Sequence, residues 1–322
     1  MKSPIKSLFE KRLALCLAAT AAVALPSHGQ TGDGDATSAE AAEKERKVAF
    51  TVGTGLEYDS NVAVLELDAT SGEGDLAALV DFGIGFDANP TERFSFAADY
   101  NFSDMMHQEF DEYDVRVQRG SATGSFDFGR VDVGASHHHA LADLDGNDFL
   151  TLSQTSPFVT KLIGERLFMR LAYAYTDKDF ATSPGRDAAT DSIDTEFFVF
   201  VDGVKTYLSF GWRYDDEDAV DPQFDYAANR FKAQFSRRLA LASREVTVKT
   251  YLRLEDRDYV NPTLSIGEVR DDRRLQLEAV AEIPLTQRID AQLSYKYADN
   301  ESNLPSLDFD EDVFTVSFSA DF

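Results

Sequence analysis

The end of the chain constrains its fold more than any other stretch. In residues 312–322, Phe314, Val316, Phe318 and Phe322 fall on one face, and small or polar residues alternate with them on the other. This alternation has the two-residue period of a β-strand. A closing strand that is apolar and aromatic on one side, and small and polar on the other, is typical of a transmembrane β-barrel.

The same alternation recurs along the chain. It predicts strands over residues 47–58, 75–87, 93–103, 113–128, 131–141, 148–162, 166–176, 194–201, 204–214, 226–239, 245–255, 273–283, 288–298 and 312–322. The pattern is faintest in 148–162, and 194–201 is apolar on both faces, so the outward face of these two strands stays open. In 113–128 the apolar parity changes near Gly120, which predicts a β-bulge. We therefore expect an all-β fold, a transmembrane antiparallel up-and-down β-barrel of about 14 strands.

Two features at the strand ends predict where this barrel lies. The connections after even-numbered strands are short, whereas those after odd-numbered strands, such as 177–194 and 299–312, are long and acidic. Tyrosine and tryptophan gather at the long-loop ends and phenylalanine at the short-turn ends, as interfacial girdles require. These features predict the cell outer membrane as the location, with the N- and C-termini periplasmic.

The N-terminal segment predicts secretion. Basic residues precede an apolar run over 13–26, which is shorter than the roughly 20 residues of a membrane-spanning helix. We predict a signal peptide over 1–29, a flexible periplasmic lead-in over 30–46 and an outer-membrane barrel over 47–322. The chain's single cysteine, Cys16, lies in the predicted signal peptide, so we expect no thiol in the mature protein.

The charge balance bears on partners. A formal net charge of -26 argues against nucleic acid and anionic membrane surfaces as partners. If the chain forms such a barrel, we expect outer-membrane lipid and lipopolysaccharide around its wall. We also expect divalent ions to be held loosely between the acidic loops and the lipopolysaccharide phosphates. Such a barrel also predicts barrel-insertion machinery that recognises the C-terminal strand.

Charged residues on the predicted inward faces fall into two groups. A basic wall comprises Arg166, Arg170, Lys205, Arg213, Arg230, Lys232, Arg238, Lys249 and Arg253. An acidic wall comprises Glu57, Asp81, Asp99, Glu278, Glu282 and Asp290. In a ring of about fourteen strands the two walls oppose each other, which predicts a transverse field across a wet passage. Alternatively, the same charges form mutual salt bridges and fill a closed lumen.

Small inward residues leave little side-chain volume on the acidic side of the lumen. This predicts an opening there or a place where an inward-folded loop lies. The small residues are Gly53, Gly55, Gly83, Gly85 and Ala97. Such a lumen predicts passive passage of a hydrophilic solute or polymer, and the basic wall would favour anionic or hydroxyl-rich substrates. Two alternatives stay open, namely a barrel that guides a protein partner during export or assembly, and a structural barrel with a plugged lumen.

Catalytic and metal-binding signals are weak. Strand alternation points His137 and His139 one way and His138 the other, so we do not expect them to share one ion. A short acidic segment has part of the spacing of a calcium loop but lacks the distant bidentate glutamate. It comprises Asp143, Asp145, Asn147 and Asp148. We expect no metal, no cofactor and no enzymatic activity.

Two segments resemble a known family. They read G-L-E-Y-D-S-N-V at 55–62 and Y-K-Y-A-D-N-E-S-N at 295–303. Both are similar to the opening and closing hairpins of the barrel in surface lipoprotein assembly modifiers and in related outer-membrane barrels. The resemblance implies a fourteen-stranded barrel that helps lipoproteins reach the cell surface, which makes a surface lipoprotein the partner in the export alternative.

This chain departs from the family pattern at one point. Family members carry a periplasmic helical-repeat domain before the barrel, and residues 31–46 are too short for such repeats. The departure concerns the export role and not the barrel. We expect the polar residues of the two motifs to shape turns at the rim, through side-chain hydrogen bonds to nearby backbone. These residues are Asp59, Asn61, Asn300 and Asn303, and we expect Tyr58 to anchor the aromatic belt.

Overall fold

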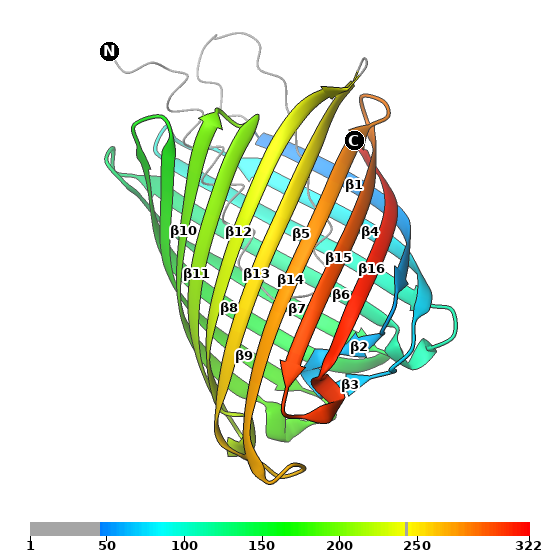
Figure 1. Ribbon diagram of the computed structural model, residues 1–322. Coiled ribbons are helices and arrows are strands. Elements are labelled where there is room, and N and C mark those ends of the chain that lie inside the picture. Colours follow the sequence, from blue (N-terminus) through cyan, green and yellow to red (C-terminus); the bar gives the residue numbers. More distant parts are fainter. Residues whose placement is uncertain (1–45, 242–243) are drawn as a thin grey trace.

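The computed structural model describes residues 46–241 and 244–322. Fourteen long antiparallel strands form one closed barrel (Figure 1), as the alternating pattern predicted. They are β1 (Arg46–Asp59), β4 (Asp75–Ala88), β5 (Phe94–His107), β6 (Val115–Asp127), β7 (Asp132–Leu144), β8 (Asn147–Ile163), β9 (Leu167–Phe180), β10 (Ala188–Asp202), β11 (Thr206–Ala219), β12 (Tyr226–Leu241), β13 (Arg244–Thr263), β14 (Glu268–Pro284), β15 (Ile289–Ser302) and β16 (Phe309–Asp321). The predicted signal peptide over 1–29, and the lead-in over 30–46 except its last residue, lie outside the described residues.

Each long strand pairs with its neighbours in sequence, and the pairing of β1 with β16 closes the ring. In this seam Leu56 lies opposite Val316 and Thr54 lies opposite Phe318, so the apolar faces of the first and last strands are in register. A closed ring leaves no unpaired strand edge, which is the condition for β-structure inside a lipid bilayer. The terminal strand therefore completes the barrel, as its alternation predicted.

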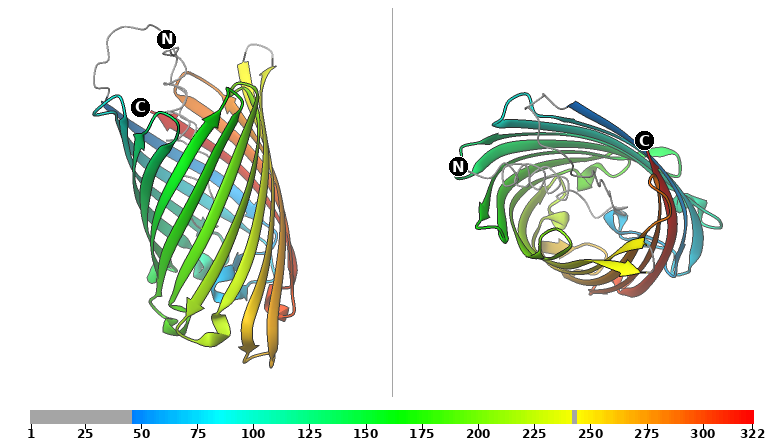
Figure 2. Two further views of the ribbon diagram at one scale, coloured as in Figure 1. Left: turned by 90° about the vertical axis from the view of Figure 1, so that its left-hand side faces the viewer. Right: turned by 90° about the horizontal axis from the view of Figure 1, so that it is seen from above.

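The connections divide between the two ends of the barrel (Figures 1 and 2). The short-turn rim, where β1 begins and β16 ends, carries the connections 89–93, 128–131, 164–166, 203–205 and 285–288. The long-loop rim carries 60–74, 108–114, 145–146, 181–187, 220–225, 264–267 and 303–308. Short elements cap the long-loop rim, namely β2 (Ala63–Val64), η2 (Leu65–Leu67), β3 (Ala69–Thr70), η3 (Asp111–Tyr113), η4 (Pro184–Arg186), η5 (Pro222–Phe224) and η6 (Pro305–Leu307).

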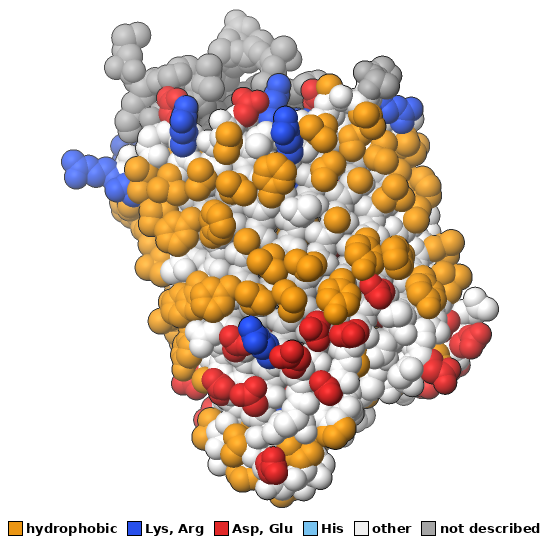
Figure 3. All heavy atoms as spheres, in the orientation of Figure 1, with side chains coloured by type: hydrophobic (Ala, Val, Ile, Leu, Met, Phe, Trp, Pro, Cys, Tyr) orange, Lys and Arg blue, Asp and Glu red, His pale blue; other side chains and the backbone are white. Residues whose placement is uncertain are grey.

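The outer face of the barrel carries an apolar band. Leu56 and Phe314 are 55% and 52% exposed, which places the predicted apolar faces outside and the charged faces inside. On the face shown in Figure 3, most Lys and Arg side chains lie toward the short-turn rim and most Asp and Glu side chains toward the long-loop rim. Among the described residues, no helix is long and apolar enough to cross a membrane.

The strands run further toward the long-loop rim than the apolar pattern indicated. The sequence places a long acidic connection over 177–194, whereas β9 continues to Phe180 and β10 begins at Ala188. The reason is that apolar alternation marks only the part of a strand that faces lipid. The backbone hydrogen bonds of a ladder continue beyond it into water, where either face can be polar.

The structure also settles three local questions. In β8, Phe158 is buried inside while Thr155 and Pro157 are exposed, and in β10 Phe198 and Phe200 point inward. The predicted bulge near Gly120 is absent, because the pairing of β6 with β5 and with β7 runs without a register shift. Its parity change has another cause, since the apolar side chains that break the pattern contact an inward-folded loop described below.

Candidate functional site in the lumen

Six residues of the predicted basic wall lie on the inner face of the strands, namely Arg170, Arg213, Arg230, Lys232, Lys249 and Arg253. The other three lie near the short-turn rim. Arg166 and Lys205 are exposed residues of the turns before β9 and β11, so they lie at the end of the barrel and not along the inner face of a strand. Arg238, close to the end of β12, is 3.9 Å from Glu245 at the start of β13.

Asp215 on β11 joins cations from two strands. Its carboxylate accepts hydrogen bonds from Arg213 Nε at 2.6 Å and from Ser192 Oγ at 2.6 Å, and it pairs with Arg230. Arg230 donates in turn to Glu255 on β13 at 2.9 Å. Only 1% of the Asp215 side chain is exposed. A carboxylate this deeply buried is stable as a charged group only because its hydrogen bonds are satisfied.

A second network surrounds Glu217, nearer the long-loop rim. Its carboxylate accepts hydrogen bonds from Lys178 Nζ at 2.5 Å, Thr190 Oγ1 at 2.8 Å and the Tyr226 hydroxyl at 2.8 Å. The guanidinium of Arg257 lies 4.3 Å from the centre of the Tyr226 ring, a cation–π contact. Most of these residues lie beyond the strand ends that the apolar pattern predicted, so the sequence did not indicate this network.

The two predicted walls meet and pair at the border of β13 and β14. Lys249 contacts Glu282 at 2.5 Å, and Arg253 contacts Glu278 at 3.1 Å. These glutamates therefore neutralise cations beside them, whereas the sequence assigned them to the wall that faces the cations across the lumen. Cross-strand neighbours on one face are close enough for ion pairs, which explains this pairing.

The remaining inner cations also have acidic neighbours. Lys232 pairs with Glu196, and the Arg170 guanidinium lies 3.5 Å from Asp194 and 5.0 Å from the centre of the Phe158 ring. Carboxylates thus stand between the cations along β10 to β14. The lining is therefore not one basic surface. Opposite charges alternate along it, and a neighbouring carboxylate offsets the field of each cation.

The other residues of the predicted acidic wall face inward with polar neighbours. Glu57 accepts a hydrogen bond from Thr315 Oγ1 at 2.8 Å, and Asp99 accepts one from Ser121 Oγ at 2.5 Å. Asp81 lies opposite Gly53 on β1, and Asp290 lies opposite Ser319 on β16.

One loop folds into the barrel. The first loop, residues 60–74, contains β2, η2 and β3 and lies within the ring at the long-loop end (Figures 1 and 2). Val64 from this loop is 7% exposed and packs in a cluster with inward side chains of β6 to β9. The cluster comprises Val64, Val117, Ala142, Phe149, Leu150 and Phe180, with Val115 packed against it. An inward-folded loop is therefore present. It packs against the inner face of β6 to β9, and not against the strands that carry Gly53, Gly55, Gly83 and Gly85.

Asp68 ties the first loop to two distant parts of the ring. Its carboxylate accepts a hydrogen bond from Arg270 Nη1 on β14 at 2.9 Å and pairs with Arg186 in the 181–187 loop. Arg186 also donates to the backbone oxygen of Glu66 at 3.0 Å. Arg270 is 2% exposed and is bound in addition by Asp272. The loop is thereby held by two arginines, one from β14 and one from the 181–187 loop.

The motif residues of the predicted hairpins shape this rim. The backbone N–H of Asn61 donates to Asp59 Oδ1 at 2.9 Å, and Asn61 Oδ1 accepts from Thr70 Oγ1 at 2.6 Å and from the Gly72 N–H at 3.0 Å. In the other motif, Asn303 Nδ2 donates to the backbone oxygen of Val269 at 2.9 Å. Their role in loop shape agrees with the prediction from the sequence.

The candidate metal ligands are placed apart. His137 and His139 point outward and donate to or accept from hydroxyls of β8 at 2.9 Å, while His138 points inward. The acidic segment resembling a calcium loop spans the end of β7, the two-residue turn 145–146 and the start of β8, with Asp145 at φ 51°. Within residues 46–241 and 244–322, no group of three or more potential ligands is gathered as a metal site.

A closed antiparallel ring with an apolar exterior and a charged interior defines a transmembrane β-barrel of the outer-membrane type. The sequence profile of the surface lipoprotein assembly modifier family matches residues 107–322. The chain belongs to this family. No curated protein sequence matches it significantly.

Solved structures similar to this one are outer-membrane barrels. The anion-selective porin from Comamonas acidovorans is 11% identical, with a TM-score of 0.54, covering 87% of this chain and 100% of the porin. In-vitro folded OmpT of Vibrio cholerae, in its trimer form, is 7% identical, with a TM-score of 0.54, covering 86% of this chain and 99% of that chain. At such low identity the likeness shows the fold alone.

Proposed function

We propose that this chain is a gated outer-membrane barrel that helps place lipoproteins on the cell surface, with its lumen closed at rest by the first loop. The short-turn rim faces the periplasm and the long-loop rim faces the outside. Family membership supports the lipoprotein as cargo. The observation that carries the gate is Asp68, which binds Arg186 and Arg270 from two separate parts of the ring.

The lining suits a protein segment better than a simple ion. Because cations and carboxylates alternate along β10 to β14, the lining offers both hydrogen-bond donors and hydrogen-bond acceptors at short intervals. An extended polypeptide carries donors and acceptors along its whole length and fits such a surface. A filter for ions of one sign needs an uncompensated field instead.

The gate requires a stimulus that releases the first loop. Asp68 is bound by side chains of the 181–187 loop and of β14, so a partner that binds either segment from outside would weaken the closure. Such a ligand shifts the equilibrium by its difference in affinity for the closed and open states. A segment of the lipoprotein cargo that enters the lumen at the short-turn rim would reach the same contacts from inside the barrel and act as such a ligand.

The proposal is tested in cells that lack this chain. Lipoproteins are labelled with an alkyne fatty acid, the surface of intact cells is biotinylated, and doubly labelled proteins are identified. We expect one or more lipoproteins to leave the surface fraction without the chain and to return with the wild-type gene. An unchanged surface set would contradict the assignment.

A second candidate is a solute channel that prefers anionic or hydroxyl-rich molecules. The inward cations of β9 to β13 favour it, since six of the predicted basic residues do line the lumen. It predicts steady conductance from the unmodified barrel, whereas the gated barrel predicts very little. A structural barrel with a plugged lumen predicts no conductance even after the first loop is released.

A further inference from the structure

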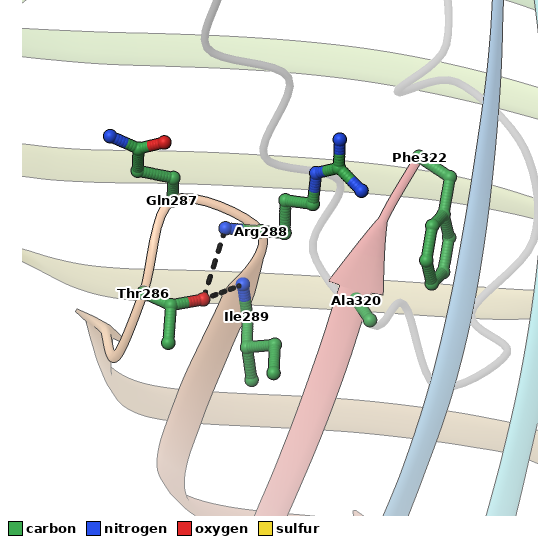
Figure 4. A pocket seen from close by; sticks show the side chains of 6 residues that line it. All are labelled: Thr286, Gln287, Arg288, Ile289, Ala320 and Phe322. Carbon is green, nitrogen blue, oxygen red and sulfur yellow. Dashed lines mark hydrogen bonds between the residues drawn. The ribbon is translucent and has the colours of Figure 1, made fainter.

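A groove lies on the outer side of the barrel, at the short-turn rim beside the closing strand (Figure 4). Its volume is about 510 Å³, and it is formed by the turn between β14 and β15 together with the end of β16. The lining residues are Thr286, Gln287, Arg288, Ile289, Ala320 and Phe322. This groove is separate from the lumen and has no part in the function proposed above.

The walls of the groove are apolar and face the surrounding membrane. Ile289 lies directly opposite Ala320 in the ladder of β15 and β16, on the outward face. Ile289 is 40% exposed and Phe322 is 66% exposed. The groove therefore continues the apolar band to its edge, where acyl chains meet headgroups.

A cation stands at the polar end of the same groove. The turn is fixed by Thr286 Oγ1, which accepts hydrogen bonds from the backbone N–H groups of Arg288 at 3.1 Å and Ile289 at 3.0 Å. Figure 4 shows the Arg288 side chain extending from this turn on the side of Phe322. The side chain is exposed and forms no ion pair with another residue of 46–241 or 244–322.

The cation at this turn belongs to a regular series. An arginine or lysine lies within two residues of the start of each strand that follows a short turn, namely Arg93, Arg130, Arg166, Lys205, Arg244 and Arg288. The lumen cations of β11 to β13 described above are held by carboxylates, whereas these rim residues are exposed. Exposed cations at the edge of an apolar band match the phosphates of a lipid leaflet.

We propose that this groove binds one glycerophospholipid of the adjoining leaflet. Its phosphate would lie on the Arg288 guanidinium, and an acyl chain would lie along Ile289, Ala320 and Phe322. A guanidinium is well suited to a phosphate, because it presents several N–H donors in one plane. The proposal goes beyond the cargo-placing function and rests only on the short-turn rim facing a phospholipid leaflet.

The test uses the full chain, purified in detergent and delipidated, with phosphatidylglycerol added during native mass spectrometry. Wild type should retain one tightly bound lipid. The R288Q variant should bind it about tenfold more weakly, since hydrogen bonds to a charged group are lost. A320W, which fills the groove while keeping the cation, should weaken binding to a similar degree.

The matched control is R130Q, which removes one rim cation at another short turn and leaves the groove intact. It should bind within about twofold of wild type. Equal losses in R130Q and R288Q would overturn the site in favour of diffuse attraction to the rim. Displacement of the lipid by water-soluble glycerophosphate at equal concentration would reduce it to a phosphate site and also overturn the proposal.

A second readout identifies the occupant directly. Phosphatidylglycerol with a photoreactive acyl chain should crosslink to the peptide containing Ile289 or to the C-terminal peptide, and this labelling should fall in A320W. Labelling spread evenly around the barrel would contradict a defined groove. If A320W bound lipid normally and only impaired membrane insertion in cells, the groove would be assigned to a protein partner. These results are independent of whether the first loop closes the lumen.

Discussion

Asp68 in the first loop accepts a hydrogen bond from Arg270 on β14 at 2.9 Å, although β16 and β15 separate β14 from β1 in the ring. Asp68 also pairs with Arg186, between β9 and β10, on the far side of the barrel from β1. One carboxylate thus connects three parts of the long-loop rim. A change at this one residue should affect the closure of the mouth more than the ring itself.

Release of the first loop is measurable with a cysteine at Val64, which is buried in the loop cluster. In V64C, maleimide labelling should be slow. Adding D68N should speed it by about tenfold or more, because each lost charge-assisted hydrogen bond contributes about 1.5–3 kcal/mol. The control is D145N, an exposed position of the same rim whose left-handed backbone suits asparagine. Equal rates in D68N and D145N would show that Asp68 does not hold the loop.

The Asp215 network should dominate the stability of the inner wall. D215N leaves Arg213 and Arg230 without their shared anion, and we expect a loss of about 3–5 kcal/mol in the free energy of unfolding. Trp212, the single tryptophan, lies next to Arg213 in β11, so its fluorescence follows urea unfolding in lipid vesicles.

The neighbouring aspartate provides a control for this prediction. Asp216 follows Asp215 in β11 but is exposed on the outer face, so D216N should change stability by less than about 0.5 kcal/mol. If D215N and D216N unfolded at the same urea concentration, the network would not be a source of stability.

The pairing of the two predicted walls can be tested by exchanging charges. K249E should place two carboxylates together at Glu282 and destabilise the barrel, and K249E with E282K should restore most of the loss. We expect a coupling energy of about 1–3 kcal/mol for this part-buried pair. Arg273 and Asp256 form a matched pair on the same two strands, 3.5 Å apart and more than half exposed, and their exchange should give less than about 1 kcal/mol. Equal coupling in both pairs would contradict the role of burial.

The orientation of the barrel follows from the accessibility of its rims. N147C, an exposed position at the start of β8 on the long-loop rim, should react with a membrane-impermeant maleimide on intact cells. R130C, in a short turn, should react only after the outer membrane is opened. The reverse pattern would place the short turns outside and contradict both the proposed orientation and the phospholipid leaflet assigned to Arg288.

Strand alternation was sufficient to predict the ring but not its inner contacts. Phe314, Val316 and Phe318 gave the outward face of β16 directly, because lipid selects apolar side chains at every second position. Inside the barrel, parity places Asp215 and Glu255 but does not say which strand neighbours they reach. That depends on register, which the apolar pattern of a single strand does not contain.

The position and contacts of the first loop lay beyond prediction for a different reason. Its anchor, Asp68, meets residues about 120 and 200 positions away in the chain, and no local pattern records contacts at that separation. One signal was present but had a different explanation. Val115 and Val117 break the outward parity of β6 because they face the apolar side of the loop, and not because the strand bulges.

Closure of the lumen by the first loop is tested most directly by single-channel recording of the refolded chain in a planar bilayer. Wild type should show rare or no openings, and D68N should show frequent openings of one constant size, while D145N behaves as wild type. Steady conductance from the wild-type barrel would contradict closure and favour the solute channel. Silence from a correctly folded D68N barrel would show that the lumen is blocked by something other than the Asp68 contacts.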